Sequence, residues 1–355
     1  MSAIYKKLEE VCEILDSRRV PITAKNRKAG IYPYYGANGL QDYVAEYIFD
    51  DELVLLAEDG GNFGSKERPI AYRVSGKCWV NNHAHVLKAK PLVNVDYLCY
   101  ALMFYNTEGL VNGATRQKLT QMAMRQMVIP YRNMTEQLQI VDEINQVISL
   151  IDKRKEELSL LDQLVKSRFI ELFGDPLKND KGLPTVSGEA LFKLSNGKTL
   201  PNSKRYTEGI PAYGGNGISW YTDEILCDYD TIIIGRVGFQ SGNVHLAKAP
   251  LWVTDNAMYI SSINSKECDI RFLCALMEHI DFTQYQDAGD LKKITQKPFM
   301  QMNYLMPPIS LQRQYITFVA QTDKSKYYSQ KFLTLCRLAV NTYEQEWMKC
   351  QTLNF

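Results

Sequence analysis

Apolar side chains recur every three or four residues over a long stretch in the middle of the chain. With an interruption near Lys155, the apolar positions are Val141, Ile144, Ile148, Ile151, Leu158, Leu161, Val165 and Leu172. No glycine or proline occurs between Thr135 and Gly174, and Pro176 follows shortly after. The spacing predicts one amphipathic helix with a coiled-coil-like seam, ending at the glycine.

A second stretch of the same kind follows Pro307 and Pro308. Its apolar positions alternate steps of four and three residues: Leu333, Cys336, Val340, Tyr343, Trp347 and Cys350. Each apolar stripe needs a partner, and antiparallel pairing of the two helices within the chain is the simplest solution. About forty residues would form a rod of roughly 60 Å. Helices of another protein could instead cover part of the seam.

The remaining sequence is β-rich and contains an internal repeat. YGANGLQDY and YGGNGISWY begin at residues 35 and 213, an offset of 178, and LVLLAEDGGNFG at 53 matches TIIIGRVGFQSG at 231 with the same offset. Further matches follow in the same order: VNNHAHVL with VTDNAMYI, and QKLTQ with KKITQ. A repeat this long indicates tandem copies of a whole domain, because solenoid repeats have periods of about 20 to 50 residues.

These patterns predict a mixed α/β fold in which two tandem domains of similar fold are separated by two long helices pairing as an antiparallel coiled coil. The predicted division is a first domain at 1–133, a central helix at 134–174, a second domain at 175–308 and a C-terminal helix at 309–355.

Composition excludes several functional classes. The chain has 41 Lys and Arg against 40 Asp and Glu, so DNA binding requires positive charge gathered on one surface. No apolar run reaches the ~18–20 residues of a membrane span, and MSAIYKKLEE has no signal-peptide core, so we expect a cytoplasmic protein without membrane contact. The eight cysteines are scattered without a C-x-x-C pair and are expected as small core residues.

Catalytic motifs are absent from the sequence. NGKT at 196–199 is similar to the end of a G-x-x-x-x-G-K-[ST] phosphate-binding loop, but Phe192 occupies the position of the motif's first glycine. There is no Asp/Asn-Pro-Pro-aromatic tetrapeptide, H-E-x-x-H or G-x-S-x-G. His83 and His85 offer only a weak metal pair, since the second copy has Asn256 and Met258 there. We therefore expect no catalytic residue and no metal ligand.

The glycine-rich loops of the two copies keep a small residue at 57 and 235 and the glycine pairs Gly60/Gly238 and Gly64/Gly242, while other side chains change. Glu58 becomes Arg236, Asp59 becomes Val237 and Asn62 becomes Gln240. Glu can accept a hydrogen bond from cytosine, whereas Arg and Gln can pair with guanine or adenine edges. The pattern is typical of two domains that recognise different DNA sequences, although drift in surface loops would produce it too.

Basic residues recur at matched positions beside Thr120-Gln121 and Thr295-Gln296. Tyr35 and Asn38, like Tyr213 and Asn216, are interpreted as structural turn residues. The candidate DNA-binding residues are Lys66, Arg68, Arg116, Lys118, Arg236, Gln240, Lys292 and Lys293.

Several phrases together resemble one family, the specificity (S) subunit of Type I restriction–modification systems. They are YYGANGLQDYV with LLAEDGGNFG, GATRQKLTQ before a proline, LDQLVKSRFIELFGDP, and AYGGNG with TIIIGRVG, and they extend over essentially the whole chain. The resemblance implies a non-catalytic chain whose two target-recognition domains each read half of a bipartite, asymmetric site in double-stranded DNA.

It also implies that the helices space the halves and dock two adenine-N6 methyltransferase (M) subunits. S-adenosylmethionine would then bind the partners, as would ATP with Mg²⁺ on a possible restriction (R) subunit, and this chain would bind no cofactor. Two alternatives remain: a coiled-coil scaffold for proteins, and a nuclease, for which Asp290-Leu-Lys292 is the one carboxylate-x-Lys candidate.

Overall fold

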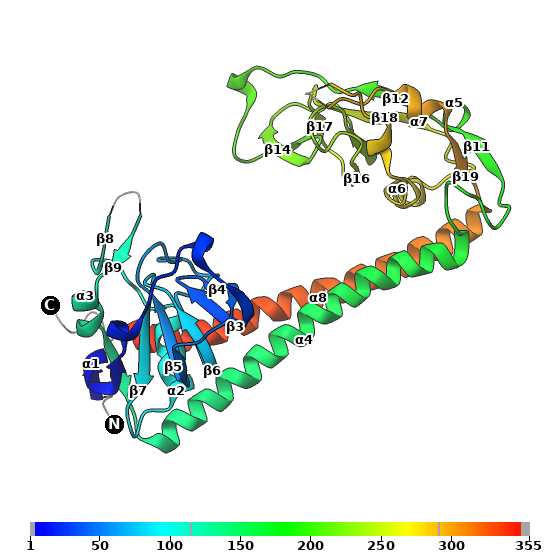
Figure 1. Ribbon diagram of the computed structural model, residues 1–355. Coiled ribbons are helices and arrows are strands. Elements are labelled where there is room, and N and C mark those ends of the chain that lie inside the picture. The colour runs from blue at the N-terminus through cyan, green and yellow to red at the C-terminus, as the bar shows by residue number, and fades with distance from the viewer. Residues whose placement is uncertain (1–3, 114–115, 290–291, 349–355) are drawn as a thin grey trace. The chain divides into compact units, whose positions relative to one another are not determined.

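The computed structural model describes residues 4–113, 116–289 and 292–348, with side chains as far as residue 336 (Figure 1). The fold is mixed α/β, as predicted. The chain forms two compact units, Met1–Glu156 with Gln330–Phe355 (unit 1) and Glu157–Ser329 (unit 2). Two long helices, α4 (Met134–Phe173) and α8 (Ile309–Met348), each contribute residues to both units.

Unit 1 is built on a six-stranded sheet of order β2-β7-β5-β6-β3-β4. Its strands are β2 (Cys12–Ile14), β3 (Ala29–Gly36), β4 (Gly39–Val44), β5 (Phe49–Ala57), β6 (Ala71–Val80) and β7 (Ala84–Ala89). Around it lie β1 (Ile4–Lys7), α1 (Leu8–Val11), the 3-10 turns η1 (Asp16–Arg18) and η2 (Ala24–Asn26), α2 (Val95–Met103), β8 (Val111–Asn112), β9 (Lys118–Leu119), α3 (Gln121–Gln126) and β10 (Val128–Tyr131). The central strand β5 is apolar on both faces because both are covered, and Leu53 to Ala57 are buried.

Unit 2 repeats this framework in two smaller sheets, ordered β12-β18-β15-β16 and β14-β13-β17. Its strands are β11 (Thr185–Ser187), β12 (Phe192–Asn196), β13 (Ile210–Gly214), β14 (Gly217–Thr222), β15 (Thr231–Gly235), β16 (Val244–Ala247), β17 (Trp252–Val253), β18 (Ala257–Ile263) and β19 (Asn303–Leu305). Its short helices are α5 (Gly188–Leu191), η3 (Asn202–Lys204), α6 (Ile270–Glu278), η4 (Phe282–Tyr285) and α7 (Lys297–Gln301).

Strand pairing confirms the duplication. β3 pairs antiparallel with β4 and parallel with β6, and β13 pairs antiparallel with β14 and parallel with β17. In the parallel pairs Tyr35 faces Val80 and Tyr213 faces Val253. These are positions that the sequence repeat aligned.

The duplication extends into the first turn of each long helix. Gln137 is buried, accepts a hydrogen bond from Asn94 N at 2.7 Å and donates to Leu92 O at 2.9 Å. Gln312 is buried, accepts from Asp269 N at 2.9 Å and donates to Glu267 O at 2.8 Å. Asn94 and Asp269 are the N-caps of α2 and α6, so each long helix is tied to its own copy in the same way.

The predicted seam of α4 is confirmed, since all eight of its positions are buried or half-buried. On α8, Leu333 is half-buried and Cys336 is buried; the side chains of Val340, Tyr343 and Trp347, and Cys350 altogether, lie outside the described residues.

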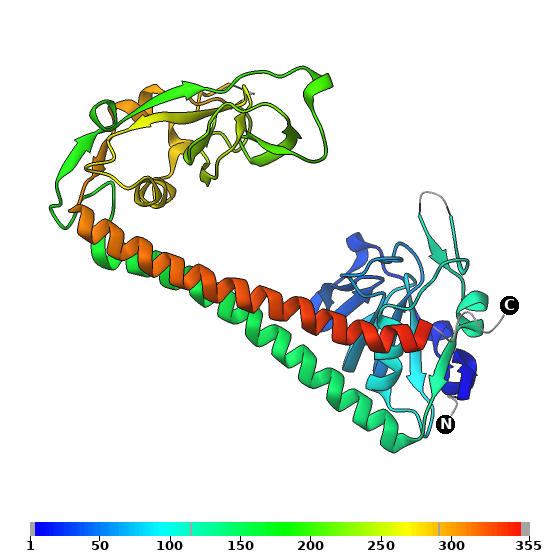
Figure 2. The ribbon, with the colours of Figure 1, turned by 180° about the vertical axis from the view of Figure 1, so that it is seen from behind.

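The helices pair antiparallel in each unit, as predicted. In unit 1, the Arg154 guanidinium lies 5.1 Å from the Phe332 ring centroid. In unit 2, Lys326 Nζ lies 2.6 Å from Asp162 Oδ1 and the Phe169 and Tyr315 rings pack edge to face at 5.5 Å. Within unit 2, α8 and the last turns of α4 lie side by side in both views (Figures 1 and 2). The spacing of the two copies stays a prediction.

Candidate nucleic-acid interface

Three segments far apart in the sequence meet in unit 1: the turn at 35–39, the glycine loop at 58–64 (loop 1) and the basic segment at 116–121. Gly60 N donates to Gln117 O at 3.0 Å and Leu119 N donates to Glu58 O at 2.8 Å, so that Asp59 and Lys118 form a β-bridge. The turn joins through Asn38, whose Nδ2 donates to Gly60 O at 3.0 Å. The turn of the repeated phrase is therefore hydrogen-bonded to the glycine loop.

Unit 2 makes the same arrangement with its glycine loop at 236–242 (loop 2) and its basic segment at 292–296. Gly238 N donates to Lys292 O at 2.8 Å and Ile294 N donates to Arg236 O at 3.0 Å, with a β-bridge between Val237 and Lys293. The turn packs closely here as well, because a Cβ added at Gly215 would lie 3.2 Å from Gly235 Cα.

The predicted basic residues differ in their partners. In unit 1, Arg116 and Lys118 are exposed but ion-paired: Arg116 Nε contacts Asp59 Oδ1, and Lys118 Nζ lies 3.2 Å from Glu58 Oε1. In unit 2, Arg236, Lys292 and Lys293 have no carboxylate within ion-pair distance among the residues that the structure describes. Among the described residues, the positive charge beside loop 2 therefore has no carboxylate partner, whereas Asp59 and Glu58 pair with the basic residues beside loop 1.

The other candidate DNA-binding residues are exposed in or just after the two loops. Lys66 and Arg68 are exposed just after loop 1, and Gln240 is exposed in loop 2. Ser65 Oγ accepts from Arg68 N at 3.0 Å. In the described part of the chain, no hydrogen bond or ion pair joins Lys66 or Arg68 to the basic segment. Asp290, the carboxylate of the nuclease hypothesis, lies outside the described residues.

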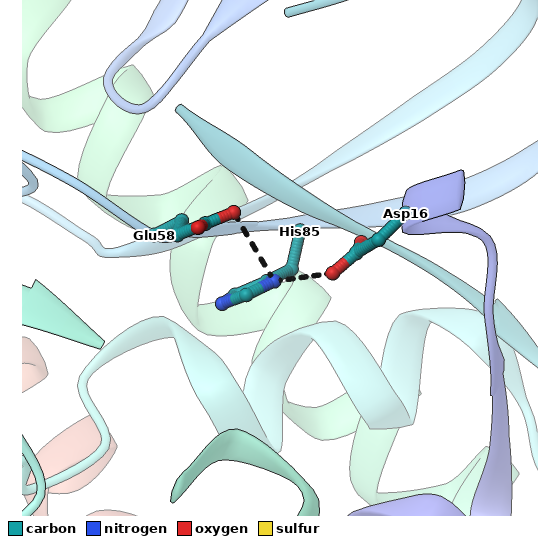
Figure 3. Close-up of side chains that lie close together, drawn as sticks. All are labelled: Asp16, Glu58 and His85. Carbon is teal, nitrogen blue, oxygen red and sulfur yellow. Dashed lines mark hydrogen bonds and ion pairs between the residues drawn. The ribbon is translucent and has the colours of Figure 1, made fainter. Parts of the chain in front are cut away.

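A buried polar cluster lies beneath loop 1 and was missed by sequence reasoning (Figure 3). His85 is fully buried on β7; its Nδ1 lies 2.7 Å from Asp16 Oδ2 and 3.6 Å from Glu58 Oε2, and its Nε2 lies 2.9 Å from Leu119 O. Both ring nitrogens therefore have an oxygen partner within hydrogen-bond distance. His85 thus braces the loop, the basic segment and the Asp16 turn together.

Asp16 and Glu58 are also held by cations. Arg19 Nη1 lies 2.6 Å from Glu58 Oε2 and Arg19 Nη2 lies 3.5 Å from Asp16 Oδ2. Burial alone would raise the pKa of Asp16, but its hydrogen bond to His85 and the His85 charge, with further bonds from Val86 N and Gln121, hold that pKa below its ordinary value.

Asp16, Glu58 and His85 are residue types that ligate metals, and their ligand atoms lie within 4.8 Å of one another. Arg19 and Lys118 already pair with the carboxylates, and a bound cation would have to compete with both. The geometry is that of an ion-pair network.

The second copy keeps the scaffold of this cluster without its charges. Gln121 Nε2 donates to Asp16 Oδ2 at 2.9 Å, and the aligned Gln296 Nε2 donates to Asn196 Oδ1 at 3.2 Å. The buried Met258 replaces His85. With Arg236 in place of Glu58 and Val237 in place of Asp59, unit 2 lacks both carboxylates that pair with Lys118 and Arg116 in unit 1.

None of the helices in the described part of the chain is both long enough and apolar enough to span a membrane.

Comparison with known proteins agrees with this geometry. Residues 4–160 match the family model described as the Type I restriction modification DNA specificity domain. A putative type I restriction enzyme specificity subunit of Haemophilus influenzae is 37% identical over 146 residues, covering 41% of this chain and 37% of that protein. The EcoprrI specificity subunit of Escherichia coli is 29% identical over 85 residues, covering 24% and 20%. The matched segments thus span well under half of these curated relatives.

Solved structures match over nearly the whole chain. The S subunit of a Type I restriction–modification system from M. genitalium has a TM-score of 0.60 and 16% identity, covering 96% of this chain and 95% of that one. A chain from a structure on complex assembly and conformational transition of the type I R–M system also has a TM-score of 0.60, with 14% identity and coverage of 98% and 97%. These matches confirm the predicted fold, and the family model and the sequence relatives confirm the resemblance to Type I specificity subunits over the segments that they match.

Proposed function

We propose that this chain is the DNA-specificity subunit of a Type I restriction–modification complex, and that it is not itself catalytic. Each recognition domain, 1–133 and 175–308, reads one half of a bipartite, asymmetric site in double-stranded DNA. The helices at 134–174 and 309–355 set the spacing of the two halves. The observation that carries this proposal is the recurrence of one backbone arrangement, turn, glycine loop and basic segment, with different side chains in each copy.

The charges of the two loops fit this role. Lys and Arg near the DNA backbone supply affinity that falls with salt, whereas side chains at base edges supply sequence preference. Lys292 and Lys293 fit the first task, with Lys66, Arg68, Arg116 and Lys118 as their counterparts in unit 1. Arg236 and Gln240 fit the second, since both types can make paired bonds to purine edges.

The partners follow from the same proposal. Two adenine-N6 methyltransferase subunits dock on the chain and bind S-adenosylmethionine, and a restriction subunit that uses ATP and Mg²⁺ can join them. This chain binds no cofactor or metal of its own, and the complex works in the cytoplasm.

A map of N6-methyladenine across the genome of a host tests the proposal. The host expresses the partner methyltransferase with and without this chain, and with the chain we expect a two-part motif that is otherwise absent. A purified complex of both proteins that methylates no motif would contradict DNA specificity and favour a protein scaffold. Cleavage of DNA by the purified chain with a divalent metal would instead favour the nuclease.

A further inference from the structure

Phe239, in loop 2, is an unusually exposed aromatic residue. Its side chain is 89% exposed, more than any other large apolar side chain in the part of the chain with described side chains. Single exposed apolar residues are common on surfaces, so exposure alone carries no function. The surroundings of Phe239 carry the argument.

The backbone on either side of Phe239 is held in place. Gly238 N donates to Lys292 O at 2.8 Å, and Ser241 N donates back to Gly238 O at 3.0 Å to close the turn. From another segment, Gln286 Nε2 donates to Phe239 O at 3.3 Å and to Ser241 O at 2.7 Å. The ring therefore projects from a fixed turn, which lowers the entropy lost when it is buried against a partner.

Loop 1 shows the opposite arrangement of its aromatic residue. The residue aligned with Phe239 is Gly61, and the aromatic of loop 1 is Phe63, which is half-buried against the core of unit 1. Ser241, aligned with Phe63, is fully buried. The aromatic side chain points inward in one copy and outward in the other, on the same loop framework.

The charges beside Phe239 indicate which partner would cover it. Arg236, Lys292 and Lys293 lie on the adjoining backbone bridge and have no carboxylate within ion-pair distance in the described residues. Two acidic residues of the described chain meet them through backbone atoms: Asp255 O accepts from Arg236 Nη1 at 3.4 Å, and Asp287 N donates to Lys293 O at 2.8 Å. An exposed apolar side chain beside basic residues fits a partner that is negatively charged outside and apolar between its stacked bases. A base-paired duplex is such a partner.

We propose that Phe239 enters the duplex as a wedge between two base pairs of the half-site read by unit 2. The inference rests on the proposed function and adds a mode of recognition to it. Proteins that insert Phe or Leu at a base step unstack it and read how easily the sequence deforms, so Phe239 would select a flexible step such as a pyrimidine–purine step.

The test uses the complex of the full chain with its methyltransferase and duplexes carrying the motif found by methylation mapping. A set of duplexes carries a single nick at successive phosphates of the unit 2 half-site, because a nick loosens stacking at one step and keeps every base pair. We expect the wild-type complex to bind the duplex nicked at the wedged step about tenfold more tightly than the intact one.

Two substitutions then separate the wedge from general contact. Phe239→Ala is expected to weaken binding to the intact duplex about tenfold to a hundredfold and to remove the preference for the nick. Phe239→Leu keeps an apolar wedge and is expected to keep that preference. Ile31→Ala, which removes an apolar side chain that is 78% exposed in unit 1, is the matched control and should bind like wild type.

The outcomes distinguish the inference from the function beneath it. If wild type is sequence-specific while Phe239→Ala keeps its affinity and nick profile, the wedge is refuted and the specificity function stands. If Phe239→Ala loses the methyltransferase but binds DNA unchanged, Phe239 is a protein contact and the wedge is equally refuted. If no motif exists for wild type, the proposed function itself has failed.

Discussion

Replacing Asp16 by Asn tests whether the cluster beneath loop 1 holds the recognition framework of unit 1 together. Asp16 is 7% exposed and accepts bonds from His85 Nδ1 at 2.7 Å, Val86 N at 2.9 Å and Gln121 Nε2 at 2.9 Å. Asn has nearly the same shape but only one acceptor oxygen. Its amide nitrogen would face donors, and the carboxylate charge beside His85 and Arg19 would be gone.

The size of the effect follows from what is left unpaired. Removing one partner of a buried ion pair costs about 3 to 5 kcal/mol. Glu58 remains 3.6 Å from His85 Nδ1 and 2.6 Å from Arg19 Nη1, so part of the compensation survives. We therefore expect Asp16→Asn to lower the free energy of unfolding of unit 1 by about 3 kcal/mol, at the lower end of that range.

The effect has a defined pH dependence. The folded state lowers the pKa of Asp16 from its ordinary value of 3.8, so its stabilising contribution is present above that value and is lost as the pH falls through the lowered pKa. The difference between wild type and Asp16→Asn should shrink below about pH 4.

The assay is unfolding in urea, monitored by hydrogen exchange of peptides covering β7 in unit 1 and β15 in unit 2, because a chain of two units need not unfold in one step. Asp230→Asn is the control. Asp230 pairs with Lys248 Nζ at 2.6 Å in unit 2 but is 40% exposed, so its loss should cost no more than about 1 kcal/mol. Equal, small losses for both variants, or a difference that persists at low pH, would refute the reasoning.

Three further outcomes are expected. Lys293→Ala should weaken DNA binding by the complex equally on all sequences and reduce the slope of log K against log salt by about 0.9, and an unchanged slope would remove Lys293 from the interface. Arg236→Ala should relax specificity at one position of one half-site at a cost of about 1 to 3 kcal/mol, measured on a library of duplexes, whereas equal loss on every sequence would make it a backbone contact. Phe169→Ala removes a fully buried ring where α4 meets α8 and should destabilise unit 2 by about 3 to 5 kcal/mol in urea, against about 1 kcal/mol or less for its exposed neighbour in Ile170→Ala.

The helices and the repeat could be predicted from the sequence because both are periodic or self-similar signals. The central helix was expected at 134–174 and spans Met134–Phe173, and its seam points inward throughout. The turn, loop and basic segment of each copy were also recognised as matching phrases. That these three segments lie together in space could not be predicted, because no local sequence pattern shows which strands pair.

The buried cluster could not be predicted for a related reason. Asp16, Glu58 and His85 come from three separate segments, and a lone histidine or carboxylate in a β-rich run carries no spacing that marks it as buried. Only the comparison of the copies held a signal: Glu58 and His85 are replaced together, by Arg236 and Met258. Many other aligned positions also differ between the copies, so this paired change does not by itself identify a contact.

The repeated phrase at 35–43 and 213–221 specifies the framework of the fold, and the target has to be specified elsewhere. Gly39 and Gly217 turn the chain with φ of 104° and 103°, a conformation that favours glycine, and Gly215 lies against Gly235 where a side chain would crowd the loop. Gly39 and Gly217 are alike in both copies because the turn requires them, whereas the first copy has Ala37 and Ala57 where the second has Gly215 and Gly235. Two copies that read different half-sites must differ in what they present to DNA, and the differences fall on Glu58 and Arg236, on Asn62 and Gln240, and on the direction of the loop's aromatic ring. A new target would therefore be sought by changing these positions while the glycines are kept.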